Sequence, residues 1–289
     1  MKFVIDIPSI NKLSGGINRM KEMHEALQQF GHSSELHLSC DNSLPDHDYV
    51  ITYSDNPRIN ELCKQAKKVI VYQLSYGMAL DREREVVYHN DTIVCCSTTH
   101  IQKKILTDKA SKTIYYIGHS QETTLNQFYP EDTILNKRLF DVAIMIHKAT
   151  DKHFLKAFNY CKSAGLKICL FGARNTGFNL SGADRIIFNA NPAKVRWVLS
   201  NSKKYLSLSS TEGLNRPGIE AMLCGCRPYI VDGCEIYKDG INCKKIKCPE
   251  EIHENFKMCD YIDIKQQLRK YTWKETLKNL GGIIGKDLL

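Results

Sequence analysis

Two glutamates with seven residues between them carry the clearest chemical signal in the sequence. Glu212 stands before a glycine-bearing turn, and Glu220 stands in the first turns of the helix expected after it. An ionised carboxylate accepts hydrogen bonds from the two hydroxyl groups of a vicinal sugar diol. The unpaired N–H groups at a helix start favour an anion such as a phosphate. Diol acceptors next to phosphate donors indicate a nucleotide sugar.

The elements that must position these glutamates follow a strand–turn–helix order. We expect a strand at 205–208, a polar turn, and a short helix with Pro217 at its first position. Gly225 is expected to end that helix, because glycine enters the left-handed conformation of a helix C-terminus at little cost. Taken alone, the same stretch also fits an ordinary strand–turn–helix with solvated carboxylates.

A second glycine turn stands near the start of the chain. An apolar strand at 2–7 is followed by Gly15 and Gly16, and then by a helix that we expect to end at Gly31. Glycines in this position let a ligand approach the backbone closely. The spacing is not Gly-x-Gly-x-x-Gly, which disfavours a nicotinamide or flavin cofactor. The helix shows an apolar stripe at helical spacing, made by Ile17, Met20, Met23, Leu27 and Phe30.

Composition describes a soluble globular protein with an uneven charge. The chain has 289 residues and a net charge of +8, and no apolar run approaches the roughly 20 residues of a membrane span. Residues 1–135 carry 14 Lys and Arg against 17 Asp and Glu, whereas residues 136–289 carry 26 against 15. A basic second half fits a phosphorylated or polyanionic partner, or simply a solvated lysine-rich surface. None of the 12 cysteines forms a Cys-x-x-Cys pair, so we expect buried reduced thiols, no metal site and a cytoplasmic location.

Short apolar runs alternate with helical patterns through both halves of the chain. This alternation favours parallel sheets covered by helices on both faces, and therefore an α/β fold. A second set of elements begins with the apolar run at 140–146. The strands that we expect are at 2–7, 49–52, 69–72, 92–96, 113–117, 140–146, 167–171, 185–188, 204–208 and 227–231.

The stretch around the two glutamates resembles the Glu-x7-Glu signature of retaining GT-B-fold glycosyltransferases, the large group (glycosyltransferase family four) that includes sucrose and glycogen-type synthases. The usual form of that signature is Glu-Gly-Phe-Gly-Leu-Pro-x-x-Glu-Ala-Met-Ala-x-Gly. Leu214, Asn215 and Arg216 depart from it. The residues that fit it are Glu212, Gly213, Pro217, Glu220, Ala221, Met222 and Gly225.

The resemblance implies a GT-B architecture, in which two Rossmann-like doubly wound domains face a central cleft. We expect an acceptor domain at 1–135, a nucleotide-sugar domain at 136–268, and a C-terminal helix at 269–289 that returns to the first domain. Further segments resemble the group in chain order: Gly118-His119-Ser120 with Phe128-Tyr129-Pro130, then 235–242, and Tyr271-Thr272-Trp273.

The reaction implied is transfer of a hexose or pentose from a nucleoside-diphosphate sugar, such as a UDP-sugar, to an acceptor hydroxyl with retention at the anomeric carbon. By the resemblance, Glu220 accepts the ribose hydroxyls, and Glu212 contacts the donor sugar or the reacting centre. Lys152 and the helix starts would stabilise the diphosphate, so no metal ion or other cofactor is required. The remaining donor-binding candidates are Gly15, Gly16, Lys148, Gly213, Leu214, Asn215 and Arg216.

Two places depart from the group's pattern. Where the group has Gly-Arg, this chain has Ile146 and His147, and either Arg216 or Lys148 could supply the missing charge. A solvated loop lysine is the plainer interpretation of Lys148. The histidine that the group places near the sugar is also missing. The acceptor-side candidates are therefore Gln73, Tyr76 and His119, although His119 also fits a satisfied loop histidine.

The acceptor is the least determined part of the sequence interpretation. The basic second half suits a nucleic-acid backbone. A compact chain rich in lysine, isoleucine and asparagine is also typical of bacteriophage enzymes, which would act in the host cytoplasm. We therefore favour a hydroxymethylated pyrimidine in double-stranded phage DNA as the acceptor. The alternatives are a precursor of cell-surface polysaccharide or glycolipid, or a non-catalytic nucleotide-binding module with the same fold.

Overall fold

The computed structural model divides the chain into two compact units. The first unit contains residues 1–120 and 271–289, and the second contains residues 121–270. The division falls at 120/121 rather than at the expected 135/136, because α5 (Glu122–Gln127) packs against α7 (Pro192–Ser200) of the second unit. The structure describes residues 1–9, 15–41, 43–75, 80–108, 112–131, 137–146, 152–172, 178–210, 213–231 and 233–289.

The first unit is built on a parallel sheet of six strands in the order β2-β1-β3-β4-β5-β6. Its first strand pairs with β2 on one side and with β3 on the other, so the chain winds outward in both directions from β1. The strands are β1 (Lys2–Ile7), β2 (Ser33–Leu38), β3 (Tyr49–Tyr53), β4 (Val69–Gln73), β5 (Thr92–Cys96) and β6 (Ile114–Tyr116).

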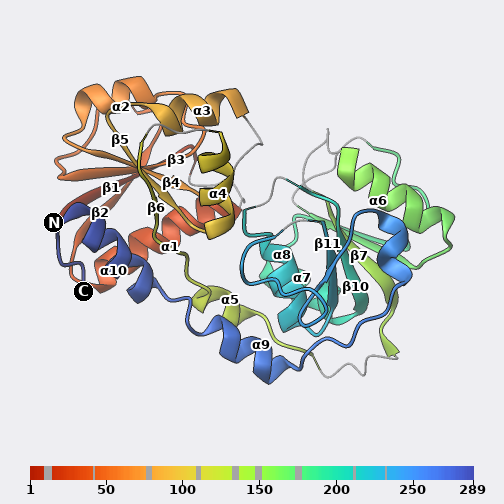
Figure 1. The fold of residues 1–289 in the computed structure, drawn as a ribbon. Helices are drawn as coiled ribbons and strands as arrows, with labels where there is room; N and C mark the ends of the chain where they lie inside the picture. Colours follow the sequence, from red (N-terminus) through yellow and green to blue (C-terminus); the bar gives the residue numbers. More distant parts are fainter. Residues whose placement is uncertain are drawn as a thin grey trace. The chain divides into compact units, whose positions relative to one another are not determined.

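Helices cover both faces of this sheet, because its strands are apolar on both sides. Phe3 and Ile5 face α1 (Gly15–Gln29), whereas Val4 belongs to the core under α2 (Ile59–Gln65), α3 (Leu80–Tyr88) and α4 (Thr99–Thr107). The last helix, α10 (Trp273–Ile284), buries Trp273 against the same core as α1, and Figure 1 shows the two helices side by side near both chain ends. In the expected apolar stripe of α1, Ile17, Met20, Met23 and Leu27 are buried. Phe30, just after the helix, is partly buried, and Gly31 follows with φ +83°.

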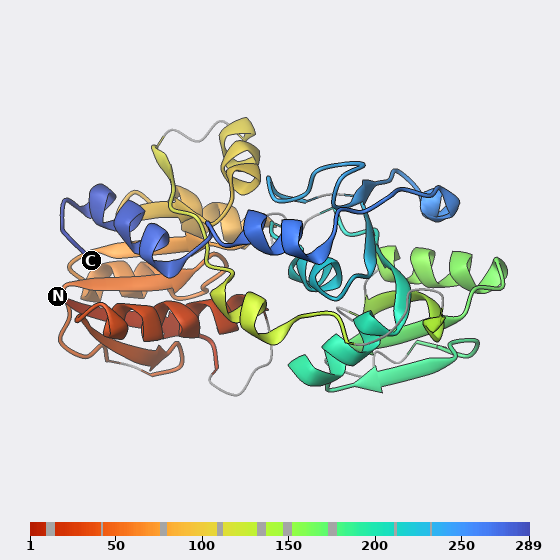
Figure 2. The same ribbon diagram turned by 90° about the horizontal axis from the view of Figure 1, so that it is seen from below.

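The second unit holds another parallel sheet of six strands, in the order β12-β11-β10-β7-β8-β9. Read from β9, this is the order of a doubly wound nucleotide-binding sheet. The strands are β7 (Phe140–Ile146), β8 (Ile168–Gly172), β9 (Arg185–Phe188), β10 (Ser202–Ser207), β11 (Arg227–Ile230) and β12 (Lys244–Lys245). The helices are α5, α6 (Lys152–Ser163), α7, α8 (Arg216–Leu223), the 3-10 helix η2 (Pro249–His253) and α9 (Tyr261–Leu268). Figure 2 shows the same elements after a quarter turn.

The α/β class with two parallel, helix-covered sheets is confirmed. Thr98 caps α4 by accepting the Ile101 N–H at 3.2 Å. Residues 249–253 form a 3-10 helix. The cysteines among the described residues are all free thiols. Over the described part of the chain, no helix has the length and apolar character needed to cross a bilayer.

Candidate functional site

The winding of the second sheet determines where a ligand can bind in that unit. From β7 the chain continues to β8 and β9 on one side, and later to β10, β11 and β12 on the other. In open α/β sheets, ligands bind outside the carboxyl ends of the two strands where the winding reverses, here β7 and β10. The helices that follow these two strands are α6, which starts at Lys152, and α8, which starts at Arg216. The motif recognised in the sequence thus lies at the switch point.

The turn before α8 is held in a left-handed conformation. Asn215 has φ 47° and ψ 56°, and its carbonyl oxygen accepts hydrogen bonds from the Gly218 N–H at 2.9 Å and from the Tyr237 hydroxyl. A Cβ at position 218 would lie 2.5 Å from the Tyr237 hydroxyl oxygen, so this close approach requires glycine. Arg216 is the first residue of the helix and Pro217 the second, one position later than expected for the proline. Tyr237 therefore fixes the shape of the turn.

The side chain of Asn215 is the most unusual feature of this helix start. Only 1% of the residue is exposed, it does not cap the helix, and neither its amide nitrogen nor its amide oxygen has a hydrogen-bond partner among the described residues. An unsatisfied buried amide costs on the order of 1–3 kcal/mol, which a polar ligand at the helix N-terminus would recover. The sequence marked Asn215 as a departure from the group's signature and as one of the donor-binding candidates. Its burial could not be recognised without the fold.

Glu220 lies on α8 and is 8% exposed, so it does not face an outer surface. Its carboxylate oxygen Oε1 lies 3.1 Å from Nε of Arg216, one helical turn earlier. The sequence left Arg216 as a candidate for the diphosphate, and the structure shows that its guanidinium also contacts Glu220. The pair orients the carboxylate at the start of the helix. Gly213 is buried and Leu214 half-buried in the turn that precedes α8.

The glycine pair of the first unit lies within a helix rather than in a loop. Helix α1 begins at Gly15, so both glycines belong to its first turn, after the carboxyl end of β1. A Cβ at Gly16 would lie 3.7 Å from the Leu74 side chain, an ordinary contact, and Gly16 is exposed. Among the described neighbours, packing does not itself demand glycine at position 16.

His119 and Gln73 both lie at the carboxyl edge of the first sheet, on either side of Ser97. His119 is 1% exposed, stacks on Tyr271 with ring centroids 5.0 Å apart, and lies 2.8 Å from the Ser97 carbonyl oxygen through Nδ1. Because a carbonyl only accepts, Nδ1 carries the proton and Nε2 carries a lone pair. Burial lowers the pKa of His119 to about 4, so the ring is neutral near pH 7.

Three polar atoms at this edge are buried and have no hydrogen-bond partner among the described residues: Gln73 Oε1, Ser97 Oγ and His119 Nε2. They come from the ends of three neighbouring strands, and the Ser97 N–H donates to the Gln73 carbonyl at 3.1 Å. The Gln73 amide nitrogen donates to the Ser75 carbonyl. Gln73 is fully buried as the last residue of β4, which extends one residue beyond the strand expected at 69–72. Ser97 was not recognised as a candidate.

Glu212, Tyr76, His147 and Lys148 lie outside the described residues, and the structure describes only the backbone of Lys152, at the start of α6. Among the residues that are described, no group of three or more His, Cys, Asp or Glu side chains could hold a metal ion.

Comparison with known proteins identifies the fold. No protein-family model and no curated protein matches the sequence. Among solved structures, sucrose-phosphate synthase from Thermosynechococcus elongatus matches with a TM-score of 0.71 and 10% identity over 98% of each chain. An alpha-glucosyltransferase in complex with UDP and a 13-mer DNA containing an HMU base matches with a TM-score of 0.59 and 14% identity, over 96% of this chain and 94% of that chain. T4 phage BGT in complex with its UDP-glucose substrate matches with a TM-score of 0.56 and 14% identity, over 99% of this chain and 96% of that chain.

At these identities the similarity is one of fold, and it extends over nearly the whole of each chain. The two six-stranded parallel sheets and their order along the sequence agree with the architecture expected from the Glu-x7-Glu stretch. The chain has the GT-B fold that these glycosyltransferases share.

Proposed function

We propose that this protein is a retaining glycosyltransferase that moves a hexose or pentose from a nucleoside-diphosphate sugar to an acceptor hydroxyl. The observation that carries the proposal is the start of α8 at the switch point of the second sheet. There the buried Asn215 amide has no hydrogen-bond partner among the described residues, in the turn before the helix that carries Glu220. Proteins of the same fold were solved with UDP or UDP-glucose, which supports a UDP-sugar as the donor.

In this proposal the helix start stabilises the leaving diphosphate. The unpaired N–H groups and the dipole of α8 favour negative charge at its N-terminus, where charge develops as the glycosidic bond breaks. Asn215 supplies a further amide donor, and Glu220 accepts the ribose hydroxyls. By their place in the sequence, we assign Glu212 to the reacting centre and Lys152 to the diphosphate. This arrangement needs no metal ion.

We propose hydroxymethylated pyrimidine in DNA as the acceptor. Two lines of support are the fold shared with an alpha-glucosyltransferase in complex with DNA, and the charge of the second unit. Residues 121–270 carry 23 Lys and Arg against 16 Asp and Glu, a net charge of +7, whereas the first unit carries 17 against 16. Phosphate contacts by such basic surfaces supply most of non-specific DNA affinity. The base would have to leave the stack to reach the donor.

One observation favours a second candidate, a non-catalytic nucleotide-binding module. Arg216 contacts Glu220 within the same helix, so the carboxylate has a partner without any ligand. Turnover of the donor distinguishes the two functions. A non-catalytic module would bind a nucleotide but would not cleave a nucleotide sugar to release it.

The test is incubation with a panel of nucleotide sugars and hydroxymethylated duplex DNA. We expect release of the nucleoside diphosphate together with a gain of one sugar residue on the DNA, measured by mass spectrometry, and retained anomeric configuration by NMR. Glu220→Gln should raise the donor Kd about tenfold, because an uncharged amide accepts the ribose hydroxyls less strongly. Nucleotide binding without turnover of any donor would exclude the enzyme and leave the module.

A further inference from the structure

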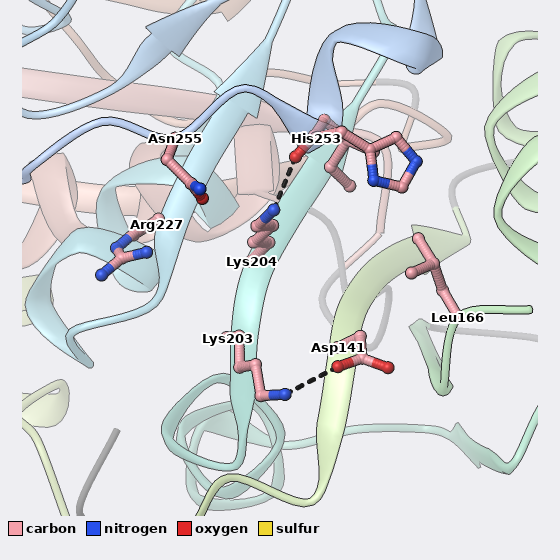
Figure 3. Close-up of a pocket in the computed structure, with 8 residues that line it drawn as sticks. Asp141, Leu166, Lys203, Lys204, Arg227, His253 and Asn255 are labelled. Atoms are coloured by element: carbon pink, nitrogen blue, oxygen red, sulfur yellow. Dashed lines mark hydrogen bonds and ion pairs between the residues drawn. The ribbon is translucent and has the colours of Figure 1, made fainter. Parts of the chain in front are cut away.

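A second polar hollow lies at the opposite end of the second sheet, where β7, β10 and β11 begin. It has a volume of about 300 Å³. Its polar walls come from Asp141, Lys203, Lys204, Arg227, His253 and Asn255 (Figure 3). The first four stand at the amino ends of their strands, and the last two come from η2 and the residues after it. The start of α8 follows the carboxyl end of β10, so the hollow is separate from the proposed donor site.

Two cations stand next to each other at this edge. Lys204 and Arg227 are direct register partners on the neighbouring parallel strands β10 and β11, so their side chains leave the same face of the sheet. Like charges on adjacent strands repel and cost stability. Burial lowers the pKa of Lys204, and the charge of Arg227 lowers it further. The fold therefore holds two positive charges together at a cost in free energy.

Among the described residues, neither cation forms an ion pair with a carboxylate. Lys204 donates one hydrogen bond, to the Ile252 carbonyl oxygen at 2.6 Å, and its ammonium lies 5.3 Å from the centre of the Tyr229 ring. Within the described ranges of the chain, the Arg227 guanidinium makes no hydrogen bond and no ion pair. Figure 3 shows Arg227 and Asn255 together on one side of Lys204.

The only carboxylate that lines the hollow, among the described residues, is already engaged. Asp141 accepts the Lys203 ammonium at 2.8 Å through one oxygen and the Lys167 backbone N–H at 3.0 Å through the other. With Lys203, Lys204 and Arg227 positive and Asp141 negative, the lining has a net charge of +2 before His253 is considered. An anion in the hollow would relieve the repulsion between Lys204 and Arg227.

We propose that this hollow, the amino-edge pocket, binds the phosphate group of a phosphorylated ligand. A guanidinium presents a planar pair of donors that matches two phosphate oxygens, and an ammonium adds a point charge with further donors. The Asn255 amide and the His253 ring, both exposed, lie at its rim. A space of this size holds one phosphate with a small attached group. The site does not depend on the proposed glycosyltransferase activity.

The experiment uses inorganic phosphate as the probe and thermal unfolding as the readout. Phosphate replaces chloride at constant ionic strength. Because phosphate also stabilises proteins in general by exclusion from their surface, the difference in Tm response between wild type and variant reports binding in the pocket. We expect wild-type Tm to rise with phosphate concentration, and Arg227→Gln to require about tenfold more phosphate for the same rise. Arg185→Gln is the matched control. It removes an exposed arginine from the start of β9, at the same sheet edge but outside the pocket, and should behave as wild type.

A second variant keeps the test decisive if Arg227→Gln folds poorly. Asn255→Glu places a carboxylate at the exposed rim without touching the packed strands, and it should weaken phosphate binding to a similar extent. The proposal would be overturned if the Tm of wild type did not change with phosphate concentration. It would also be overturned if wild type, Arg227→Gln and Asn255→Glu showed the same change.

The source of the phosphate is distinguished by a parallel titration with a short DNA duplex, followed by fluorescence anisotropy. If Arg227→Gln weakens both duplex and inorganic phosphate binding, the pocket contacts a nucleic-acid backbone. If only inorganic phosphate is affected, its ligand is a small phosphorylated molecule. UDP affinity should be equal in wild type and in all these variants. If the protein does not bind UDP at all, the proposed function is contradicted, whereas the proposal for the amino-edge pocket stands.

Discussion

Acidification should reveal the buried, neutral state of His119. The folded protein lowers the pKa of this histidine from 6.5 to about 4, mainly because burial disfavours the charged ring. The hydrogen bond to the Ser97 carbonyl acts in the opposite direction, and the nearby charge of Arg19 lowers the pKa slightly further. Between these two pKa values the unfolded chain binds a proton at His119 that the folded chain does not.

The sign and size of the effect follow from this difference. The free energy of unfolding associated with His119 is highest above about pH 6.5, and it falls as the pH drops toward about 4. At about 1.4 kcal/mol for each pKa unit, the total loss is about 3 kcal/mol. That is a large part of the stability of an ordinary domain, so the protein should become markedly easier to unfold in mild acid.

The perturbation that isolates the effect is His119→Gln. Glutamine does not titrate, and its amide can still donate to the Ser97 carbonyl. Loss of the stack on Tyr271 lowers stability at every pH alike, so only the slope with pH reports on the ring. Urea unfolding across the range from about pH 7 to pH 4 gives the free energy of each protein.

We expect wild type to lose about 3 kcal/mol more than His119→Gln over this range. Parallel curves for the two proteins would refute the reasoning, because they would mean that solvent protonates the ring equally well in both states.

Three further substitutions test the packing around the sites. Arg138→Met should lower the unfolding free energy by about 3 kcal/mol in urea melts. The buried guanidinium donates three hydrogen bonds to backbone carbonyls near the ends of α7 and α8 and the start of β10. A loss below about 1 kcal/mol would contradict that role. Asp6→Ala should cost about 4 kcal/mol by the same assay, since the buried carboxylate is bonded to four side chains from β2, β3 and the segments after them. A Tm within a degree or so of wild type would show that these donors find other acceptors. Gly218→Ala should destabilise the turn before α8 by about 2 kcal/mol and weaken UDP binding, because the added methyl displaces Tyr237. Adding Tyr237→Phe should restore part of the stability in a double-mutant cycle, and strict additivity would argue against the clash.

Much of the fold was predictable because the local spacing of apolar residues indicates which side chains are buried. The strands at 2–7, 92–96, 140–146 and 185–188 have the predicted bounds, and most other elements differ by one or two residues. Strand β2 was missed. It is an edge strand with the pattern Ser-Ser-Glu-Leu-His-Leu, and only part of its length is buried. Helix α9 was also missed, since its exposed Ile262 blurs the apolar stripe.

The sequence by itself determined the chemistry to look for: paired glutamates, a helix start and glycines that admit a ligand. Only the tertiary structure decided which of these residues are buried and what they contact. The buried amide of Asn215, without a partner among the described residues, the tautomer of His119 and the pairing of Arg216 with Glu220 all depend on neighbours fixed by packing. The amino-edge pocket depends on strand order, which brings Lys204 beside Arg227 from 23 residues away. Local propensity carries no information on such pairings, because they arise only when distant strands join one sheet.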